Sequence, residues 1–273
     1  MGFFREDLFD GEGRLTRKSC GEYLDGFFVN GSLNGYGEVV YSNNDRYFGT
    51  FCNEQPDGSG EWFYPNGDKY KGEFKLGSKE GYGIFSCAET GERYEGQWKD
   101  NESNGEGSLY YPNGDVYTGT WYCGQFQGKG EFIYTSKAEK YIGNWTKGKK
   151  CGKGSYYFNN GDIYTGVFDN DLFHGKGEWD YPATGEKYSG DMRKGLKQGV
   201  GQLEYSNGDV YVGGFDADQV NGNGQMTYKN RDLYIGEFRS GKIHGNGEYI
   251  FADGSDHVVG IFKHGLLHKR VNP

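Results

Sequence analysis

Carboxylates recur at a regular interval along the chain and are the first candidates for chemistry. An acidic residue stands two positions before the first residue of each copy of a repeated motif. The series is Glu22, Asp45, Asp68, Glu92, Asp115, Glu139, Asp162, Glu186, Asp209, Asp232 and Asp256. A row of carboxylates could hold Ca²⁺, but a calcium site needs about six or more oxygens that converge on one point. This row offers one carboxylate per interval beside turn amides, so it predicts a turn-capping role.

Histidines and glycine motifs suggest two other kinds of site. His257, His264 and His268 lie near the carboxyl end, without the cysteine or convergent acid that would complete a metal site. Gly-x-Gly recurs throughout the chain, but no copy extends to Gly-x-Gly-x-x-Gly or precedes a helical pattern, which argues against a dinucleotide site. No nucleophile, base and orienting residue come together. We therefore expect no catalytic residue, metal, cofactor or enzyme activity.

Charge and cysteine usage limit the partners and the compartment. The net charge is -9, from acids and bases scattered along the chain, which argues against nucleic acid and disfavours an anionic membrane. The 5 cysteines are widely spaced and form no Cys-x-x-Cys pair, so a reducing environment fits best. The amino terminus has no apolar run for secretion, and Glu6 stands where N-myristoylation requires Ser or Thr. The expected location is the cytoplasm.

A repeat organises these residues, in a chain with 50 glycines, 24 tyrosines and 19 phenylalanines. Its first element is Tyr-x-Gly-x-aromatic, and its second element, Gly-x-Gly, begins 11 residues after the tyrosine. The return connection varies by one residue, so the repeat is 23 or 24 residues long. The first element begins at Tyr47, Tyr70, Tyr94, Tyr117, Tyr141, Tyr164, Tyr211 and Tyr234, with degenerate copies at Leu24, Tyr188 and Val258.

Both elements have apolar residues at every second position, which predicts strands. Asn66-Gly67, Asn113-Gly114 and similar pairs predict turns that join one repeat to the next. The six-residue connections 52–57 and 169–174 are expected to be variable and to influence partner choice. The predicted fold is all-β: an elongated, twisted, antiparallel meander forming a single-layer ribbon, on the order of 100 Å long at ~4.8 Å per strand, with a groove.

The pattern resembles the MORN repeat family, whose consensus is matched at 115–121 and again at 128–134. The resemblance implies one continuous array over residues 1–273. Residues 1–23 would form a partial repeat that caps the array, and residues 24–257 ten complete repeats. Residues 258–273 would be a further partial repeat with its cap.

The aromatic residues are the remaining candidates for a site. Most must form the core, because nothing else in the chain can supply one. Where a single layer leaves them partly covered, the same rings would line an apolar groove that binds a partner. The groove candidates are Tyr70, Trp98, Tyr117, Trp121, Tyr141, Trp145, Tyr164 and Trp179.

The resemblance also implies functions. It implies a groove open to helical or extended segments of partner proteins, and in some cases a homodimer formed through a terminal repeat. It further implies a scaffold within a cilium, flagellum, radial spoke or other cytoskeletal assembly. A phospholipid- or membrane-associated module is the second hypothesis, which the net charge disfavours. A third is association with kinase or methyltransferase domains, which some members of the family carry and this chain does not contain.

Overall fold

The computed structural model describes residues 2–5, 8–254 and 257–271. Glu6 and Asp256, which appear in the sequence analysis, lie outside these ranges. The chain divides into two compact units, Met1–Ser136 and Lys137–Pro273.

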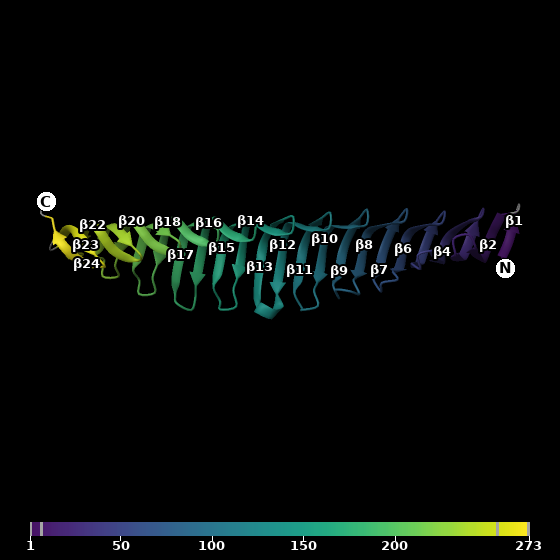
Figure 1. Cartoon of the computed structure of the whole chain (residues 1–273), viewed down its shortest axis with the longest axis horizontal. Coiled ribbons are helices and arrows are strands. Elements are labelled where there is room, and N and C mark those ends of the chain that lie inside the picture. Colours follow the sequence, from purple (N-terminus) through teal and green to yellow (C-terminus); the bar gives the residue numbers. More distant parts are fainter. Residues whose placement is uncertain (1, 6–7, 255–256, 272–273) are drawn as a thin grey trace. The chain divides into compact units, whose positions relative to one another are not determined.

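The first unit consists of strands that follow one another in chain order (Figure 1). They are β1 (Gly2–Arg5), β2 (Leu8–Arg17), β3 (Glu22–Val29), β4 (Ser32–Val40), β5 (Arg46–Cys52), β6 (Gln55–Phe63), β7 (Lys69–Lys75), β8 (Ser78–Ser86), β9 (Arg93–Lys99), β10 (Glu102–Tyr110), β11 (Val116–Tyr122) and β12 (Gln125–Tyr134). A short 3₁₀ turn, η1 (Thr135–Lys137), follows β12.

The second unit continues the same order (Figure 1). Its strands are β13 (Glu139–Thr146), β14 (Lys149–Tyr157), β15 (Ile163–Asp169), β16 (Leu172–Tyr181), β17 (Glu186–Arg193), β18 (Leu196–Glu204), β19 (Val210–Asp216), β20 (Gln219–Thr227), β21 (Leu233–Arg239), β22 (Lys242–Ile250), β23 (His257–Lys263) and β24 (Leu266–Arg270).

Within each unit, every strand pairs antiparallel with the next one along the chain. The described residues contain no α-helix. The prediction of an all-β antiparallel meander is therefore confirmed. The single continuous array of residues 1–273 remains a prediction.

Each repeat folds into a hairpin with a two-residue turn. In the turn between β5 and β6, Asn53 and Glu54 both adopt positive φ, at 49° and 64°. Two adjacent residues with positive φ are typical of the type I′ turn, whose twist matches that of the flanking strands. The expectation of six-residue connections at 52–57 and 169–174 is wrong, because strand pairing continues up to the turn, at Cys52↔Gln55 and Asp169↔Leu172. Their influence on partner choice stays a prediction.

A β-bulge explains the first glycine of Gly-x-Gly. Between β5 and β6 the register runs from Gly49↔Gly60 to Phe51↔Pro56, which leaves extra residues on β6. Gly58 lies in this interval at φ 96°, a conformation that residues with a side chain rarely adopt. The bulge therefore requires glycine at that position.

The turn between repeats comes in two lengths, which accounts for the 23- and 24-residue spacing. In the shorter form the amide of Gly67 donates to the carbonyl oxygen of Tyr64, three residues earlier. In the longer form the amide of Gly91 donates to the carbonyl oxygen of Cys87, four residues earlier. The additional residue is thus absorbed in the turn without changing the strands.

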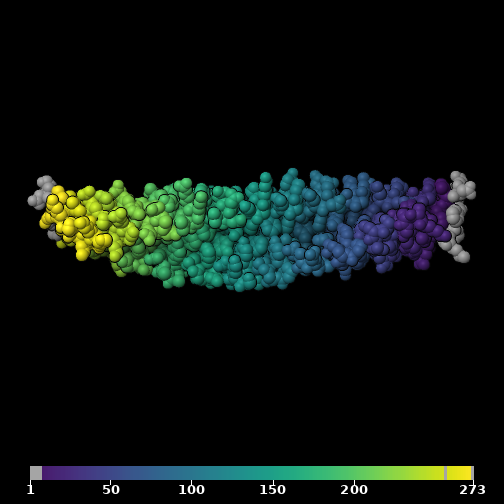
Figure 2. All heavy atoms as spheres, viewed as in Figure 1, coloured from purple at the N-terminus to yellow at the C-terminus, as the bar shows by residue number. Residues whose placement is uncertain are grey.

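Five columns of side chains share one face of the sheet, called here the ring face. Column A holds the tyrosines that begin each repeat, and column B the apolar residue four positions later. Columns C and D hold the residues two and four positions after the second glycine of Gly-x-Gly. Column E holds the residue two positions before the first glycine. In the first unit Tyr47, Phe51, Trp62, Tyr64 and Pro56 represent columns A to E. Figure 2 shows successive strands filling the surface of each unit as bands in sequence order.

Candidate functional site

Most of the predicted groove residues lie in the core instead. Tyr70, Tyr117, Tyr141 and Tyr164 in column A are 0% exposed. Trp98, Trp121 and Trp145 in column B are 8%, 5% and 4% exposed. Their assignment as an open partner surface is therefore corrected, because neighbouring rings and backbone cover them. Trp179 is half-buried and belongs to column C.

The column A tyrosines are held by their hydroxyl groups and by glycine. The hydroxyl of Tyr94 donates to the carbonyl oxygen of Gln97 at 2.8 Å. Its ring lies across the facing pair Gly96 and Gly107, where an added Cβ would come within 2.6 Å and 2.4 Å of the Tyr94 hydroxyl oxygen. Glycine at these two positions therefore makes room for the ring. Such rings are fixed parts of the sheet rather than adaptable contacts.

Column B links each repeat to the preceding one. The indole Nε1 of Trp98 donates to the carbonyl oxygen of Gly83 at 3.1 Å, and Trp121 Nε1 donates to that of Gly107 at 3.1 Å. Trp121 also packs edge-on against Tyr94 of the preceding repeat, with ring centroids 5.0 Å apart. Neighbouring repeats thereby share one core.

Columns C and D carry the accessible rings of the ring face. Trp62 stacks on Tyr41 with centroids 5.1 Å apart in the first unit, and Trp179 stacks on Phe158 at 5.3 Å and on Tyr181 at 5.4 Å in the second. All five are half-buried rather than buried. They form ladders of flat apolar surface, which are the groups a partner can reach.

Some buried polar atoms of these ladders lack a hydrogen-bond partner. Among the described residues, the buried indole Nε1 atoms of Trp62 and Trp179 have no hydrogen-bond acceptor. Burial raises the pKa of Tyr64 to about 12, and Asp45 and Asp68 add to the effect. The Tyr64 hydroxyl is therefore neutral at physiological pH, so the ladder is uncharged.

Column E covers the column A tyrosine of its own repeat, and sequence reasoning missed it. Phe126 stacks on Tyr117 with centroids 3.7 Å apart. Lys79 occupies the same position in another repeat, with its ammonium 5.1 Å from the ring centre of Tyr70. The signal was the strand alternation that continues before each Gly-x-Gly. The prediction of a connection at residues 52–57 leaves no place for this column.

Lysines occupy column E in three repeats, as Lys79, Lys150 and Lys197. The ammonium of Lys79 lies 4.7 Å from the ring centre of Phe85 and 5.0 Å from that of Trp98. Burial lowers the pKa of Lys79 to about 8 and also lowers the pKa values of Lys150 and Lys197. Each lysine thus places a partly desolvated cation on an apolar face.

The row of acids acts in the turns, as expected. Asp68 accepts a hydrogen bond from the amide of Ala88 at 2.8 Å, and Asp115 accepts one from the amide of Thr135 at 2.8 Å. Each donor lies in the next turn between repeats, so the carboxylate ties two turns together. The turn-capping prediction is confirmed for these residues. Asp256, the last member of the row, lies outside the described residues.

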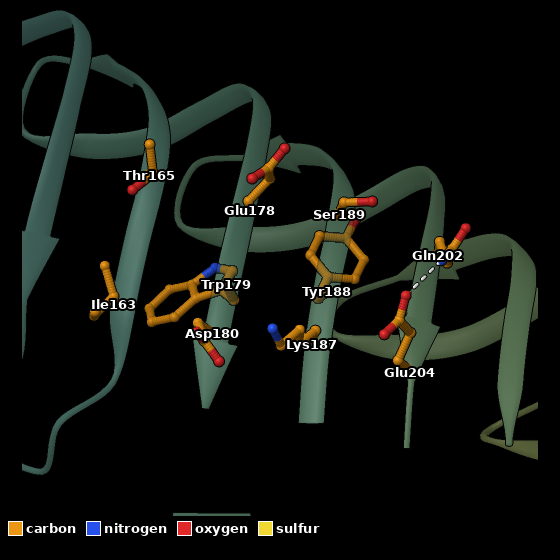
Figure 3. Close-up of a pocket in the computed structure, with 10 residues that line it drawn as sticks. All are labelled: Ile163, Thr165, Glu178, Trp179, Asp180, Lys187, Tyr188, Ser189, Gln202 and Glu204. Atoms are coloured by element: carbon orange, nitrogen blue, oxygen red, sulfur yellow. Dashed lines mark hydrogen bonds between the residues drawn. The ribbon is translucent and has the colours of Figure 1, made fainter. Parts of the chain in front are cut away.

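Depressions also lie on the opposite face of the sheet. One in the first unit measures 690 Å³, with Phe48, Phe63 and Ile84 among its lining residues and Tyr36 and Tyr82 exposed beside them. One in the second unit measures 340 Å³. Figure 3 shows it, with Thr165, Glu178, Ser189 and Gln202 on successive strands and Gln202 donating to Glu204. Its lining combines polar side chains with Ile163, Trp179 and Tyr188.

The remaining candidates from the sequence are metal ligands, histidines and cysteines. Among the described residues, no group of three or more His, Cys, Asp or Glu residues could hold a metal ion. The rings of His244 and His264 lie 5.8 Å apart. All five cysteines are free thiols. No helix in the described part of the chain is long and apolar enough to cross a membrane.

Comparison with known proteins identifies the repeat. The model of the MORN repeat matches residues 1–19, 25–46, 47–69, 70–89, 94–116, 117–138, 141–163, 164–183, 188–210, 211–233 and 234–256. The comparison with curated proteins found no match.

Two solved structures illustrate the structural similarity. The TCP10 domain of Danio rerio CPAP, in complex with a peptide of Danio rerio STIL, is 14% identical with a TM-score of 0.46, covering 83% of this chain and 93% of that one. The SAS-4 TCP domain of Drosophila melanogaster, in complex with a proline-rich motif of Ana2, is 14% identical with a TM-score of 0.37, covering 67% and 90%.

Proposed function

The chain belongs to the MORN repeat family, and from this premise we propose that it is a non-catalytic scaffold that binds segments of partner proteins along its ring face. The segments are helical or extended. The single observation that carries the proposal is the ladder of half-buried rings in columns C and D, such as Phe158, Trp179 and Tyr181. A continuous apolar surface that no neighbouring strand covers is typical of an interaction surface.

The architecture supports binding better than catalysis. Columns A and B already hold each repeat to the next, so columns C and D can contact a partner without loss of the fold. The site is rigid, because the column A rings are anchored to the backbone, as in the bond from Tyr141 to Asn144 at 2.9 Å. A preorganised face lowers the entropic cost of binding.

The setting we propose is a cytoskeletal assembly, such as a cilium or flagellum. The support is the family membership together with the resemblance to scaffold members of the family. Homodimerisation through a terminal repeat belongs to the same proposal. A phospholipid-binding role is less favoured, because the net charge is -9 and repels an anionic surface.

The test is quantitative affinity capture from the native cell, with the intact chain as bait. Phe158→Ser with Tyr181→Ser alters the ring face. Val212→Ser with Ile235→Ser is the matched control on the opposite face, where these residues are 44% and 45% exposed. Trp121 and Trp145 are unsuitable, because they are core residues and their loss would unfold the repeats.

We expect the ring-face variant to lose the proteins that the unaltered chain captures, while the control retains them. Both variants must keep their circular dichroism spectrum and thermal midpoint above the capture temperature. Unchanged capture by a folded ring-face variant would contradict the proposal. Localisation of the tagged chain away from any cytoskeletal structure would contradict the proposed setting, and flotation with phosphoinositide vesicles at physiological salt would favour the lipid role.

A further inference from the structure

Tyrosine is an unusual residue at the middle position of Gly-x-Gly. This position lies on the opposite face of the sheet, and only two of the eleven copies in the sequence place a ring there, at Tyr36 and Tyr82. These side chains are 71% and 51% exposed. Other repeats of the first unit have a small or charged residue at this position, such as Ser59 or Glu106. Exposed rings that gather beside one depression are typical of an interaction surface.

The two tyrosines stand at the two ends of the 690 Å³ depression in the first unit. Tyr36 lies on β4 and Tyr82 on β8, with β5, β6 and β7 between them. Gly60 and Gly72 face each other across β6 and β7 and belong to the lining, so no side chain fills this part of the depression. The apolar part of the lining consists of Phe48, Phe63 and Ile84. The depression is therefore a trough that crosses the strands, with a ring at each end.

An arginine of the chain shows how this surface holds a guanidinium group. The Cζ atom of Arg46 lies 4.2 Å from the ring centre of Phe48, and its Nε donates to the carboxylate of Glu38 on the neighbouring strand. The planar group thus stacks on a ring while a glutamate pairs with its edge. Among the described residues, no lysine or arginine lies over the ring of Tyr36 or Tyr82. Both rings can therefore receive a cation from another molecule.

Carboxylates stand beside both tyrosines. Glu38 follows Tyr36 by two positions on β4, so the two side chains share one face of the strand. Glu95 accepts a hydrogen bond from the hydroxyl of Tyr82 at 2.7 Å. Glu73 also lines the depression, and within the described part of the chain its carboxylate forms no ion pair. Each ring thus offers a stacking surface next to an acceptor for a guanidinium group.

The charge of the first unit favours a basic ligand. Residues 1–136 contain 22 acidic and 12 basic residues, which gives a net charge of -10. Residues 137–273 contain 17 acidic and 18 basic residues, which gives +1. The negative charge of the chain therefore belongs to the first unit. Its field attracts a cationic segment and repels an anionic one.

We infer that the depression is a second binding surface, which accepts an extended basic segment of a partner protein with one arginine over Tyr36 and another over Tyr82. The residues of this surface are separate from those of the ring face, so the inference goes beyond the function proposed there. Arginine is favoured over lysine because its planar group can stack on a ring and pair with a carboxylate at the same time. An apolar residue between the two arginines would pack against Phe48, Phe63 and Ile84.

The strand spacing sets the distance between the two arginines. Tyr36 and Tyr82 are four strand spacings apart, which is ~19 Å at ~4.8 Å per strand. An extended segment at ~3.3 Å per residue covers this distance in about six residues, an even number that places both arginines on one face. A helix at ~1.5 Å per residue would need about 13 residues, and at ~3.6 residues per turn the second arginine would point away from the sheet. The spacing therefore favours an extended segment.

The experiment is selection from a display library of random 12-residue peptides, with the intact chain as the target at physiological salt. The tyrosine variant is Tyr36→Ser with Tyr82→Ser, which introduces the residue that Ser59 already provides at the equivalent position. The matched control is Tyr110→Ser with Tyr122→Ser, which removes two other exposed tyrosines of the first unit. Circular dichroism spectra and thermal midpoints establish that both variants are folded at the temperature of the binding measurement.

We expect a group of selected peptides to bind the tyrosine variant at least tenfold more weakly than the unaltered chain and the control. Within this group, two arginines should recur six positions apart with an apolar residue between them. Replacing both arginines by lysine should weaken binding to the unaltered chain, but not to the tyrosine variant. This coupling is the signature of a direct contact. Glu73→Gln, which matches Gln97 in the next repeat, should reduce the dependence of binding on salt.

Other results would overturn the inference. The absence of such a group, or a group without arginine enrichment, would refute it. Loss of these peptides by the ring-face variant, Phe158→Ser with Tyr181→Ser, would place them on the ring face instead. A dimer of the unaltered chain and the control that the tyrosine variant does not form, without such peptides, would assign the surface to a second copy of this chain. None of these results bears on partner capture by the ring face, which is tested with other residues.

Discussion

The hydroxyl of Tyr117 donates a hydrogen bond to the carbonyl oxygen of Thr120, three residues later on the same strand, at 3.0 Å. Thr120 lies in the interval where the register between β11 and β12 shifts. The tyrosine therefore satisfies a carbonyl group at the bulge, while its ring covers Gly119 and Gly130. The same bond recurs from Tyr70 to Glu73 at 3.0 Å.

Tyr117→Phe should lower the free energy of unfolding by about 1 kcal/mol, because a partly buried carbonyl group loses its donor while the packing is retained. The measurement is equilibrium denaturation in urea. Tyr122→Phe is the matched control, since Tyr122 is 63% exposed. Equal midpoints for the two variants would show that the hydroxyl contributes nothing to stability.

Gly96→Val should destabilise the chain by more than about 3 kcal/mol, or prevent its repeats from folding. A Cβ at Gly96 would lie 2.4 Å from the Cα of Gly107 and 2.6 Å from the hydroxyl oxygen of Tyr94. The backbone of Gly107 cannot move away without breaking the strand pairing. Lys99→Val on the exposed part of the same strand should change stability by less than about 0.5 kcal/mol. A thermal midpoint of Gly96→Val close to that of Lys99→Val would disprove the steric argument.

Asp68→Asn should make stability less sensitive to acid. The amide of Ala88 lowers the pKa of Asp68, with Asn66 and other donors contributing. A carboxyl group with a lower pKa in the folded state stabilises the fold above its unfolded value of ~3.9, and this contribution is lost as pH falls through the folded value. Unfolding free energies between pH 6 and pH 3 should therefore fall more steeply for the unaltered chain than for Asp68→Asn. Glu89→Gln, an exposed change in the same turn, should retain the original slope.

Lys79→Met should raise stability at pH 7, by roughly 1 kcal/mol after allowance for solvent screening. Burial lowers the pKa of Lys79 to about 8, with Asp68 opposing the effect. Since the unfolded lysine titrates near 10.4, the unfolded state binds more protons between these values, and the unaltered chain should gain stability as pH rises from about 8 to 10.

The difference between the pH curves of the unaltered chain and Lys79→Met isolates this lysine, because tyrosine titration is common to both. Lys75→Met, on the exposed part of the neighbouring strand β7, should give a curve parallel to that of the unaltered chain. A constant difference between the unaltered chain and Lys79→Met over this range would show that the Lys79 ammonium is as well solvated as in the unfolded chain.

The sequence by itself determined the repeat, the strands and the face that carries the rings. These depend on local spacing: side chains alternate along a strand, so Tyr117, Gly119 and Trp121 must share a face. The turn role of Asp68 followed from its position beside Asn66 and Gly67.

Only the tertiary structure decided which rings are buried and which can meet a partner. Tyr117 and Trp179 are equally aromatic in the sequence, but Tyr117 is covered by Phe126, while Trp179 remains half-buried. Coverage depends on contacts between strands and on the two-residue turn that brings column E onto column A. The position of the Lys79 ammonium over Trp98 joins two repeats, and the strand period alone does not specify such a contact. Burial is set by neighbours across the sheet, whereas periodicity records only neighbours along the chain.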